Sequence, residues 1–441
     1  MAEVNADDLA RQMLREDFLT FLEKAFLHLN PGQPDFEAEW YHEAIAHRLE
    51  LVRSGELKRL MVTIPPRQLK STIISVAWPA WMLGKNPTTR FVCVSFADDL
   101  AMKHARDCRS ILQSDWYRAS FPDVSLTRIA ENDIETNRAG GRFSTTVGGT
   151  LTGRGGDVII IDDPIKPEEA NSDTARNGVN SWYQSTLLSR LNSQETGAIV
   201  LVMQRLHQND LAGDLLEQGG WNQLRLPAVA DEEESIVLPH GREHRRLPGE
   251  LLDPARLSEA TLQALRRSLG SLAFEAQFQQ NPVPAEGNLI KRDWLKRYDQ
   301  APEFRTGDRI VQSWDTASKG GARNDWSACA TALVRKHDVY LLDLSRVRLE
   351  FPDLKRKVVA MAQKYKPSTL LIEDAASGQQ LLQQLRHDES LAQLKPLARK
   401  VTTDKMSRVR AASALVENGN VLFPKEAPWL ADLSVQRSCR K

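Results

Sequence analysis

The stretch "MVTIPPRQLKSTIISVAW", residues 61–78, decides how the first half of the chain folds. It opens with an apolar, β-branched run typical of a strand and closes in a pattern typical of a helix, with Lys70 and Ser71 at the junction. In a phosphate loop, backbone N–H groups and the helix N-terminus face the anion, the lysine reaches the β- and γ-phosphates, and the hydroxyl binds magnesium. The stretch therefore predicts a phosphate loop.

The two glycines of the usual phosphate loop are absent, because positions 64 and 69 hold Ile64 and Leu69. A glycine before the lysine permits an unusual backbone angle, so Leu69 predicts a modified loop, and the charge of Arg67 can compensate. By itself the motif is weak, since a solvated Lys-Ser pair at a helix start is the commoner occurrence. The residues expected to hold the nucleotide are Arg67, Gln68, Lys70, Ser71 and Thr72.

A second motif, "DVIIIDDP" at residues 157–164, supports the first. Four apolar residues end in two carboxylates, at the strand edge where open α/β sheets bind ligands. We expect Asp162 to hold magnesium together with Ser71, and Asp163 to orient the attacking water. The plain alternative is an acidic turn after a buried strand. The two motifs on one sheet favour an ATPase.

Two arginines are candidates for stabilising the transition state. Arg154 lies in the glycine-flanked stretch "TGRGG", a loop that can approach phosphate in its own site or in a neighbouring subunit. Arg205 follows the apolar run at residues 198–203, a position suited to sensing the γ-phosphate. Either can instead pair with a surface carboxylate, which is the commoner fate of an arginine.

The order of predicted elements divides the chain. Strands at 60–64, 89–96 and 198–203 alternate with helices, one from about residue 98 and one over 182–191. A polar region without predicted strands lies between the helix near residue 98 and the stretch at residues 147–167. Several strands are continuously apolar, which indicates a parallel sheet covered on both faces. The predicted parts are a helical region at 1–55 with a helix over 7–29, a P-loop ATPase domain at 56–229, a linker or small subdomain at 230–304 and a nuclease domain at 305–441.

Composition sets limits on partners and location. The 58 basic and 58 acidic residues balance, so any grip on nucleic acid is local, transient or shared between subunits. No apolar run reaches the roughly 20 residues of a membrane span, and the N-terminus lacks an apolar signal core. The four scattered cysteines form no CxxC pair, which fits a reducing cytosol without structural zinc: Cys93, Cys108, Cys329 and Cys439.

A second pair of carboxylates follows strands near the C-terminus. Asp315 ends the run in "VQSWDTAS" and Glu373 ends the run in "TLLIEDAASG". On adjacent parallel strands both would point into one cleft, where Mg²⁺ or Mn²⁺ offsets their repulsion and supports phosphodiester hydrolysis. Three strands, a helix (353–365), a strand and a helix suit an RNase H-like nuclease, with Asp325 as a third acid. The alternative is a pair of solvated strand ends.

The chain resembles the large terminase subunit of tailed bacteriophages and prophages, the DNA-packaging motor. The motifs that carry this resemblance are "VTIPPRQLKST", "VGGTLTGRGGDVIIIDDPIKP", "HQNDLAG", "FEAQFQQNPVPAEGNLIKRDW", "SWDTAS" and "IEDAASG". The family's phosphate loops commonly diverge, with an arginine near their start, so Arg67 matches the pattern.

The resemblance implies ATP and Mg²⁺ at the first site, nuclease metal at Asp315 and Glu373, and double-stranded DNA as substrate. The implied partners are a portal protein, a small terminase subunit and further copies of the chain in a ring. Its implied place is the cytoplasm of the bacterial host, transiently docked on the procapsid, without a membrane.

One departure from the family concerns the nuclease. The family's last acidic motif, of the type D-D-x-V-D-A, is missing from "ADLSVQRSCRK", where Asp432 is the only aspartate. We expect a C-terminally truncated nuclease, impaired beside an intact ATPase. The alternatives are a helicase-like or repair ATPase that only binds DNA, and a non-catalytic prophage remnant. ATP turnover separates the remnant from the enzymes, and stimulation by procapsids separates the packaging motor from a helicase.

Overall fold

The computed structural model describes residues 6–33, 36–283, 290–316, 326–374, 376–388, 394, 396–401 and 405–430. The chain forms two compact units, Met1–Pro284 and Ala285–Lys441. The boundary between them falls inside the predicted linker at 230–304. The segment before this boundary packs with the first unit through the apolar cluster of Ala228, Leu257, Leu262, Phe274 and Phe278. The four-part division itself stays a prediction.

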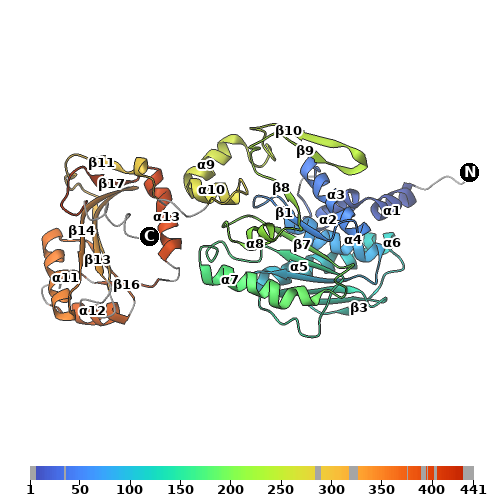
Figure 1. Cartoon of the computed structure of the whole chain (residues 1–441), viewed down its shortest axis with the longest axis horizontal. Helices are drawn as coiled ribbons and strands as arrows, with labels where there is room; N and C mark the ends of the chain where they lie inside the picture. Colours follow the sequence, from blue (N-terminus) through green and yellow to red (C-terminus); the bar gives the residue numbers. More distant parts are fainter. Residues whose placement is uncertain are drawn as a thin grey trace, which may run out of the picture. The chain divides into compact units, whose positions relative to one another are not determined.

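The first unit is built on an eight-stranded sheet with the order β3-β4-β5-β2-β6-β7-β1-β8 (Figure 1). The strands from β5 to β8 pair in parallel, whereas β3, β4 and β5 pair antiparallel. A separate hairpin pairs β9 with β10. The strands are β1 (Arg59–Thr63), β2 (Arg90–Ser95), β3 (Leu126–Ile129), β4 (Asp133–Thr136), β5 (Gly141–Thr146), β6 (Val158–Asp162), β7 (Ala198–Met203), β8 (Asn222–Arg225), β9 (Glu234–Val237) and β10 (Glu243–Arg246).

Helices cover both faces of this sheet, as the apolar strands predicted. Alternate residues of one strand enter different cores: Leu60 and Val62 join one cluster and Met61 the other. The helices are α1 (Ala6–Glu16), α2 (Phe18–Leu29), α3 (Trp40–Ser54), η1 (Thr72–Ala77), α4 (Trp78–Lys85), α5 (Asp98–Gln113), α6 (Asp115–Ser120), α7 (Asp173–Trp182), η2 (Tyr183–Leu187), η3 (Leu188–Arg190), α8 (Leu211–Gln218), η4 (Pro239–Gly241), α9 (Glu259–Leu269) and α10 (Ser271–Gln277).

The structure differs from the predicted elements mainly where strands are short and polar. β3, β4 and β5 occupy the region predicted without strands, and the hairpin of β9 and β10 occupies the predicted connector. Such sequences as "LTRI" and "EHRR" lack the apolar run that marks a buried strand. The predicted helix 7–29 is two helices, because the Asp17 side chain caps α2 by accepting a bond from the Thr20 N–H.

The second unit contains a seven-stranded sheet with the order β11-β17-β14-β13-β12-β15-β16. β12, β13 and β14 pair antiparallel, whereas β12, β15 and β16 pair in parallel, which is the RNase H-like arrangement predicted. The elements are η5 (Arg292–Trp294), β11 (Lys296–Tyr298), β12 (Arg309–Asp315), β13 (Ser327–Arg335), β14 (Asp338–Val347), α11 (Phe351–Tyr365), β15 (Thr369–Glu373), α12 (Ala376–Arg386), β16 (Leu397–Arg399), α13 (Lys405–Glu417) and β17 (Val421–Pro424).

The core of this unit lies on one face of its sheet. Trp314, Cys329 and Ile372 pack there with residues of α11 and α12. Figure 1 shows α11 on one side of β13 and β14. The residues next to these core positions, including Asp315 and Glu373, belong to the opposite face.

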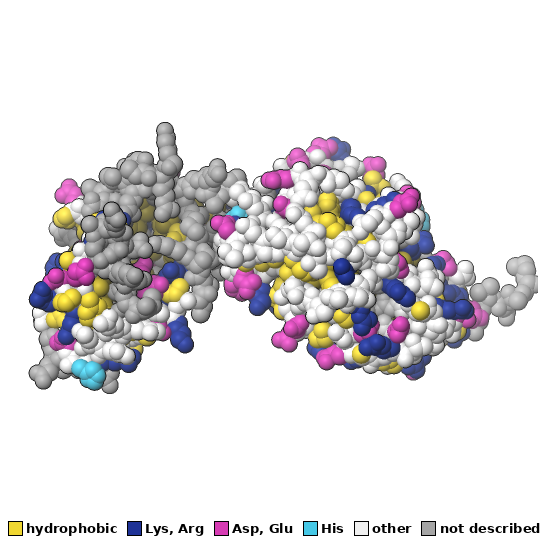
Figure 2. Space-filling model, turned by 60° about the horizontal axis from the view of Figure 1, so that its bottom comes forward, with side chains coloured by type: hydrophobic (Ala, Val, Ile, Leu, Met, Phe, Trp, Pro, Cys, Tyr) yellow, Lys and Arg dark blue, Asp and Glu magenta, His cyan; other side chains and the backbone are white. Residues whose placement is uncertain are grey.

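Surface charge and hydropathy agree with the balanced composition. On the face shown in Figure 2, basic and acidic side chains are interspersed over the described surface. Among the described residues, the helices are all too short or too polar to span a bilayer. The thiols of Cys93, Cys108 and Cys329 are free and buried, whereas Cys439 lies outside the described residues.

Candidate nucleotide site and paired nuclease carboxylates

The loop between β1 and η1 adopts left-handed backbone angles without glycine. Arg67 has φ of 70° and Leu69 has φ of 58°. Left-handed residues among right-handed ones turn successive N–H groups inward, which makes a concavity that binds anions. Such angles cost non-glycine residues about 1–2 kcal/mol each. The loop therefore adopts these left-handed angles at an energetic cost that glycine would avoid.

Five side chains from two distant stretches of sequence meet beside this loop. The Lys70 Nζ lies 2.6 Å from Asp163 Oδ2, and the Ser71 hydroxyl donates to Asp162 Oδ1 at 3.1 Å. The Ser75 hydroxyl donates to Asp162 Oδ2 at 2.6 Å. The structure thus brings the predicted lysine, hydroxyl and acidic pair together in the first unit.

Sheet topology explains why these side chains meet. Both β1 and β6 pair in parallel with β7, so their carboxyl ends share one edge of the sheet. Asp162 is the last residue of β6, and Asp163 turns the chain with φ of 44°. The Asp163 N–H donates to the Val202 carbonyl, and its Oδ1 accepts from the Gln204 N–H at 3.2 Å. These bonds fix the second carboxylate against β7.

Burial and charge act in opposite directions on the acidic pair. Burial raises the pKa of both Asp162 and Asp163, because it disfavours the charged form, and the Lys70 ammonium opposes that rise. The serine hydroxyls that donate to Asp162 also oppose it. Two crowded carboxylates are therefore kept close to one fixed cation, the Lys70 ammonium.

Two residues that sequence reasoning missed support Asp162. Arg142 of β5 is 1% exposed, and its guanidinium donates to the Ser75 carbonyl at 3.0 Å and to the Ser144 hydroxyl. Pro79, four residues after Ser75, has no N–H for that carbonyl, so Arg142 supplies the donor. His104 Nδ1 lies 3.7 Å from Asp162 Oδ2, and burial lowers the pKa of His104 to about 3, so the ring is neutral.

Gln68, predicted to touch nucleotide, is buried under the loop. Its Oε1 lies 2.7 Å from the Tyr41 hydroxyl, which is also 2.9 Å from Asp253 Oδ2. Tyr41, Gln68 and Asp253 are each at most 1% exposed. This contact anchors the loop to α3. Thr72, by contrast, is partly exposed at the start of η1, and Arg67 is exposed.

The two candidate arginines lie in other contacts. The Arg154 guanidinium is 2.9 Å from Asp133 Oδ2 and stacks over the Phe143 ring at 4.7 Å. Arg205 is buried, and its Nε is 3.0 Å from Asp210 Oδ1 at the start of α8. The structure does not bring either guanidinium onto Asp162 or Asp163. Their roles in the transition state stay predictions.

The predicted nuclease carboxylates are neighbours on parallel strands. Trp314 of β12 is in register with Ile372 of β15, so the next residues, Asp315 and Glu373, lie side by side. Asp315 is exposed, and the Glu373 Oε2 is 3.4 Å from a guanidinium nitrogen of Arg408 on α13. The structure therefore places two acids on one open sheet face.

The donor chemistry of both sites fits magnesium. Ser71 and Asp162 offer oxygen ligands beside an anion-binding loop, and Asp315 and Glu373 offer two carboxylates. Within the described residues, clusters of three or more His, Cys, Asp or Glu with metal-binding geometry are absent. Asp325, Asp432 and the C-terminal stretch that bears on the last acidic motif lie outside the described residues.

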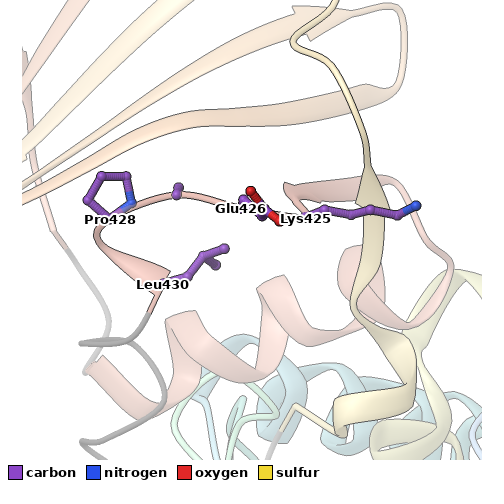
Figure 3. A pocket seen from close by; sticks show the side chains of 5 residues that line it. Lys425, Glu426, Pro428 and Leu430 are labelled. Carbon is purple, nitrogen blue, oxygen red and sulfur yellow. The ribbon is translucent and has the colours of Figure 1, made fainter.

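A cavity of about 440 Å³ follows β17 and lies elsewhere in the second unit (Figure 3). One short segment lines it, through Lys425, Glu426, Ala427, Pro428 and Leu430. The Lys425 side chain points away from the other labelled residues, and its Nζ is 2.5 Å from Asp299 Oδ1. The cavity contains none of the predicted site residues, so we assign it no function.

Comparisons with known proteins concern the second unit most directly. Residues 312–435 match the model of the terminase RNaseH-like domain family. The large terminase of a thermophilic bacteriophage, solved in complex with ADP, is 11% identical, with a TM-score of 0.49 over 91% of this chain and 88% of that chain. The HK97 bacteriophage large terminase is also 11% identical, with a TM-score of 0.41 over 93% and 90%. A comparison with curated proteins found no match. The part of this chain that a known family matches is thus residues 312–435, which are similar to the terminase RNaseH-like domain family.

Proposed function

We propose that the chain is a DNA-packaging motor subunit whose first unit hydrolyses ATP. The observation that supports this most directly is that Lys70 pairs with Asp163 and Ser71 donates to Asp162, beside a loop with left-handed backbone angles. These groups lie where the carboxyl ends of parallel strands share one edge of the sheet, which is where open α/β sheets bind ligands.

Each residue has a role in this proposal. The loop N–H groups bind phosphate oxygens, and Lys70 leaves Asp163 to neutralise the β- and γ-phosphates. Asp163 then becomes free to orient water. Ser71 and Asp162 would hold magnesium, which would supply positive charge against the phosphates. Arg67, Gln68 and Thr72 complete the loop, and Arg154 or Arg205 would reach phosphate only after leaving its present carboxylate.

Phosphate release from ATP tests this proposal. We expect turnover by the parent chain and a loss of at least about 100-fold in Lys70→Ala, because the charge that stabilises transferred phosphate is removed. The matched control is Lys85→Ala, which removes a lysine that pairs with Glu16 on another surface. Turnover that persists in Lys70→Ala would contradict the proposal.

We also propose that the second unit cuts DNA with metal held by Asp315 and Glu373; the reduced nuclease activity expected from the sequence stays a prediction. Their placement on adjacent strand ends and the family match over residues 312–435 support this role. Metal-dependent nicking of a plasmid, lost in Asp315→Asn, is the test. The ring of subunits, the portal, the small subunit and the location at a procapsid in the host cytoplasm belong to the same proposal. Stimulation of ATP turnover by procapsids tests them.

A further inference from the structure

An exposed aromatic ring close to two arginines lies at the same end of the sheet as the predicted nuclease carboxylates. The guanidinium carbons of Arg346 and Arg348 lie 4.0 and 4.4 Å from the centre of the Trp326 ring. All three residues are exposed, and the Trp326 side chain is 40% exposed although it is large and apolar. We call these three residues the Trp–Arg cluster.

Strand register places the cluster on the face of Asp315. Asp315 of β12 is opposite Ala328 of β13, which is opposite Arg346 of β14. Directly opposed residues of antiparallel strands share a face, and Trp326 lies two residues from Ala328. Arg346 is thus two strands from Asp315, roughly 10 Å at the usual strand spacing.

A guanidinium over an aromatic ring keeps its N–H donors along its own edge, where other groups can reach them. Those donors can bind phosphate oxygens in a bidentate manner while the ring holds the group in position. Successive phosphates of a DNA strand lie farther apart than the axial rise of about 3.4 Å, because they follow the outside of the helix, so roughly 10 Å spans only one or two nucleotides. A phosphate at the cluster and a phosphate at the carboxylates can therefore belong to one DNA strand.

We propose that Trp326, Arg346 and Arg348 form a clamp for the DNA backbone that sets the position of the scissile phosphate. This inference rests on the proposed nuclease role of Asp315 and Glu373. The positive charge beside two carboxylates fits DNA as the ligand. The arginines would attract the phosphates on either side of the cleaved bond, and metal at the acids would bind the phosphate to be cleaved.

The test is binding of the full chain to a short DNA duplex, measured by fluorescence anisotropy over a range of salt concentrations. In the double variant Arg346→Ala/Arg348→Ala we expect Kd to rise roughly tenfold or more. The slope of log K against log salt should become shallower by about 2, since about 0.9 is lost with each phosphate contact. Trp326→Leu should weaken binding with less change of slope, because both charges remain.

The matched control removes two positive charges from α11, on the other face of the sheet. Arg356 and Lys364 are exposed there, so Arg356→Ala/Lys364→Ala has the same net charge as the cluster variant. Equal weakening in both double variants, or unchanged binding in the cluster variant, overturns the clamp. Plasmid nicking is measured on the same samples. Nicking by the parent that Asp315→Asn abolishes, together with unchanged DNA binding in the cluster variant, refutes only the clamp, whereas nicking that persists in Asp315→Asn refutes the nuclease role on which the clamp rests.

Discussion

The acidic pair of the first unit and the acidic pair of the second unit are held in opposite ways. Asp162 and Asp163 meet a lysine, two serine hydroxyls and the backbone N–H of Gln204, and Asp162 is 1% exposed. Asp315 is exposed, and Glu373 has an arginine at 3.4 Å. The first pair is organised before any ligand arrives, whereas strand register alone brings the second pair together. We expect substitutions to affect folding at the first pair and ligand binding at the second.

Removing the buried guanidinium behind Asp162 should have the largest effect on stability. Arg142→Met leaves the Ser75 carbonyl without its donor, and we expect the free energy of unfolding to fall by about 3 kcal/mol. Urea unfolding followed by circular dichroism measures this. Arg356→Met, on the exposed side of α11, is the control and should change stability by no more than about 0.5 kcal/mol. A similar fall in unfolding free energy in Arg142→Met and Arg356→Met would contradict the expectation that the buried arginine contributes more than the exposed one.

The neutral histidine beside Asp162 predicts a pH dependence. The unfolded state protonates His104 near pH 6.5, whereas the folded state does so near its pKa of about 3. The unfolded state therefore binds more protons between these values, and stability falls as pH falls through that window. In His104→Gln the slope should decrease by up to about 1.4 kcal/mol for each pH unit.

Unfolding free energies of parent and variant at several pH values from 6.5 downward measure this difference. His42, whose pKa burial also lowers to about 3, contributes with the same sign, and the raised pKa values of Asp162 and Asp163 contribute with the opposite sign. Only the difference between parent and variant isolates His104. Parallel curves would show that His104 is protonated in the folded protein.

Backbone strain in the phosphate loop gives a third, smaller effect. Arg67 is exposed at φ of 70°, so glycine there should be more stable than alanine by about 1 kcal/mol. Both substitutions remove the charge, and both should weaken ATP turnover alike. The comparison of Arg67→Gly with Arg67→Ala in urea separates strain from charge. Equal stability would mean that the left-handed angle is not held in solution.

The exposed acidic pair should show the smallest effect on folding. Asp315→Asn removes a repulsive neighbour of Glu373 without emptying a buried contact, so unfolding free energy should change by no more than about 0.5 kcal/mol. Titration with Mn²⁺ should show weaker metal binding in the same variant. A large loss of stability would show that folding depends on the contacts of Asp315, as we expect for Asp162.

The sequence predicts those strands and site residues that follow from a local pattern of apolar and polar residues. Apolar runs revealed β1, β6 and β7, and Lys70, Ser71, Asp162 and Asp163 lie at ends of such elements. Ser75 was within reach of the same reasoning, because it lies one helical turn after Ser71 and faces the same side. Arg142 was not, since "RFST" gives no sign that its guanidinium is buried.

Arg154 and Arg205 illustrate a second limit. Their positions in the sequence suggest phosphate contacts, but Asp133 and Asp210 compete for the same guanidinium groups. Asp133 belongs to β4, one of the polar strands that the apolar pattern did not reveal. Partner choice among charged side chains depends on three-dimensional distance, which residue spacing does not give.

Calorimetric titration with Mg²⁺ and a non-hydrolysable ATP analogue tests the central claim most directly. Parent, Lys70→Ala and Asp315→Asn are compared in the same buffer. We expect the parent and Asp315→Asn to bind the analogue with equal affinity and Lys70→Ala to lose binding. Equal affinity in Lys70→Ala and the parent would contradict a nucleotide site between Lys70 and the pair Asp162 and Asp163.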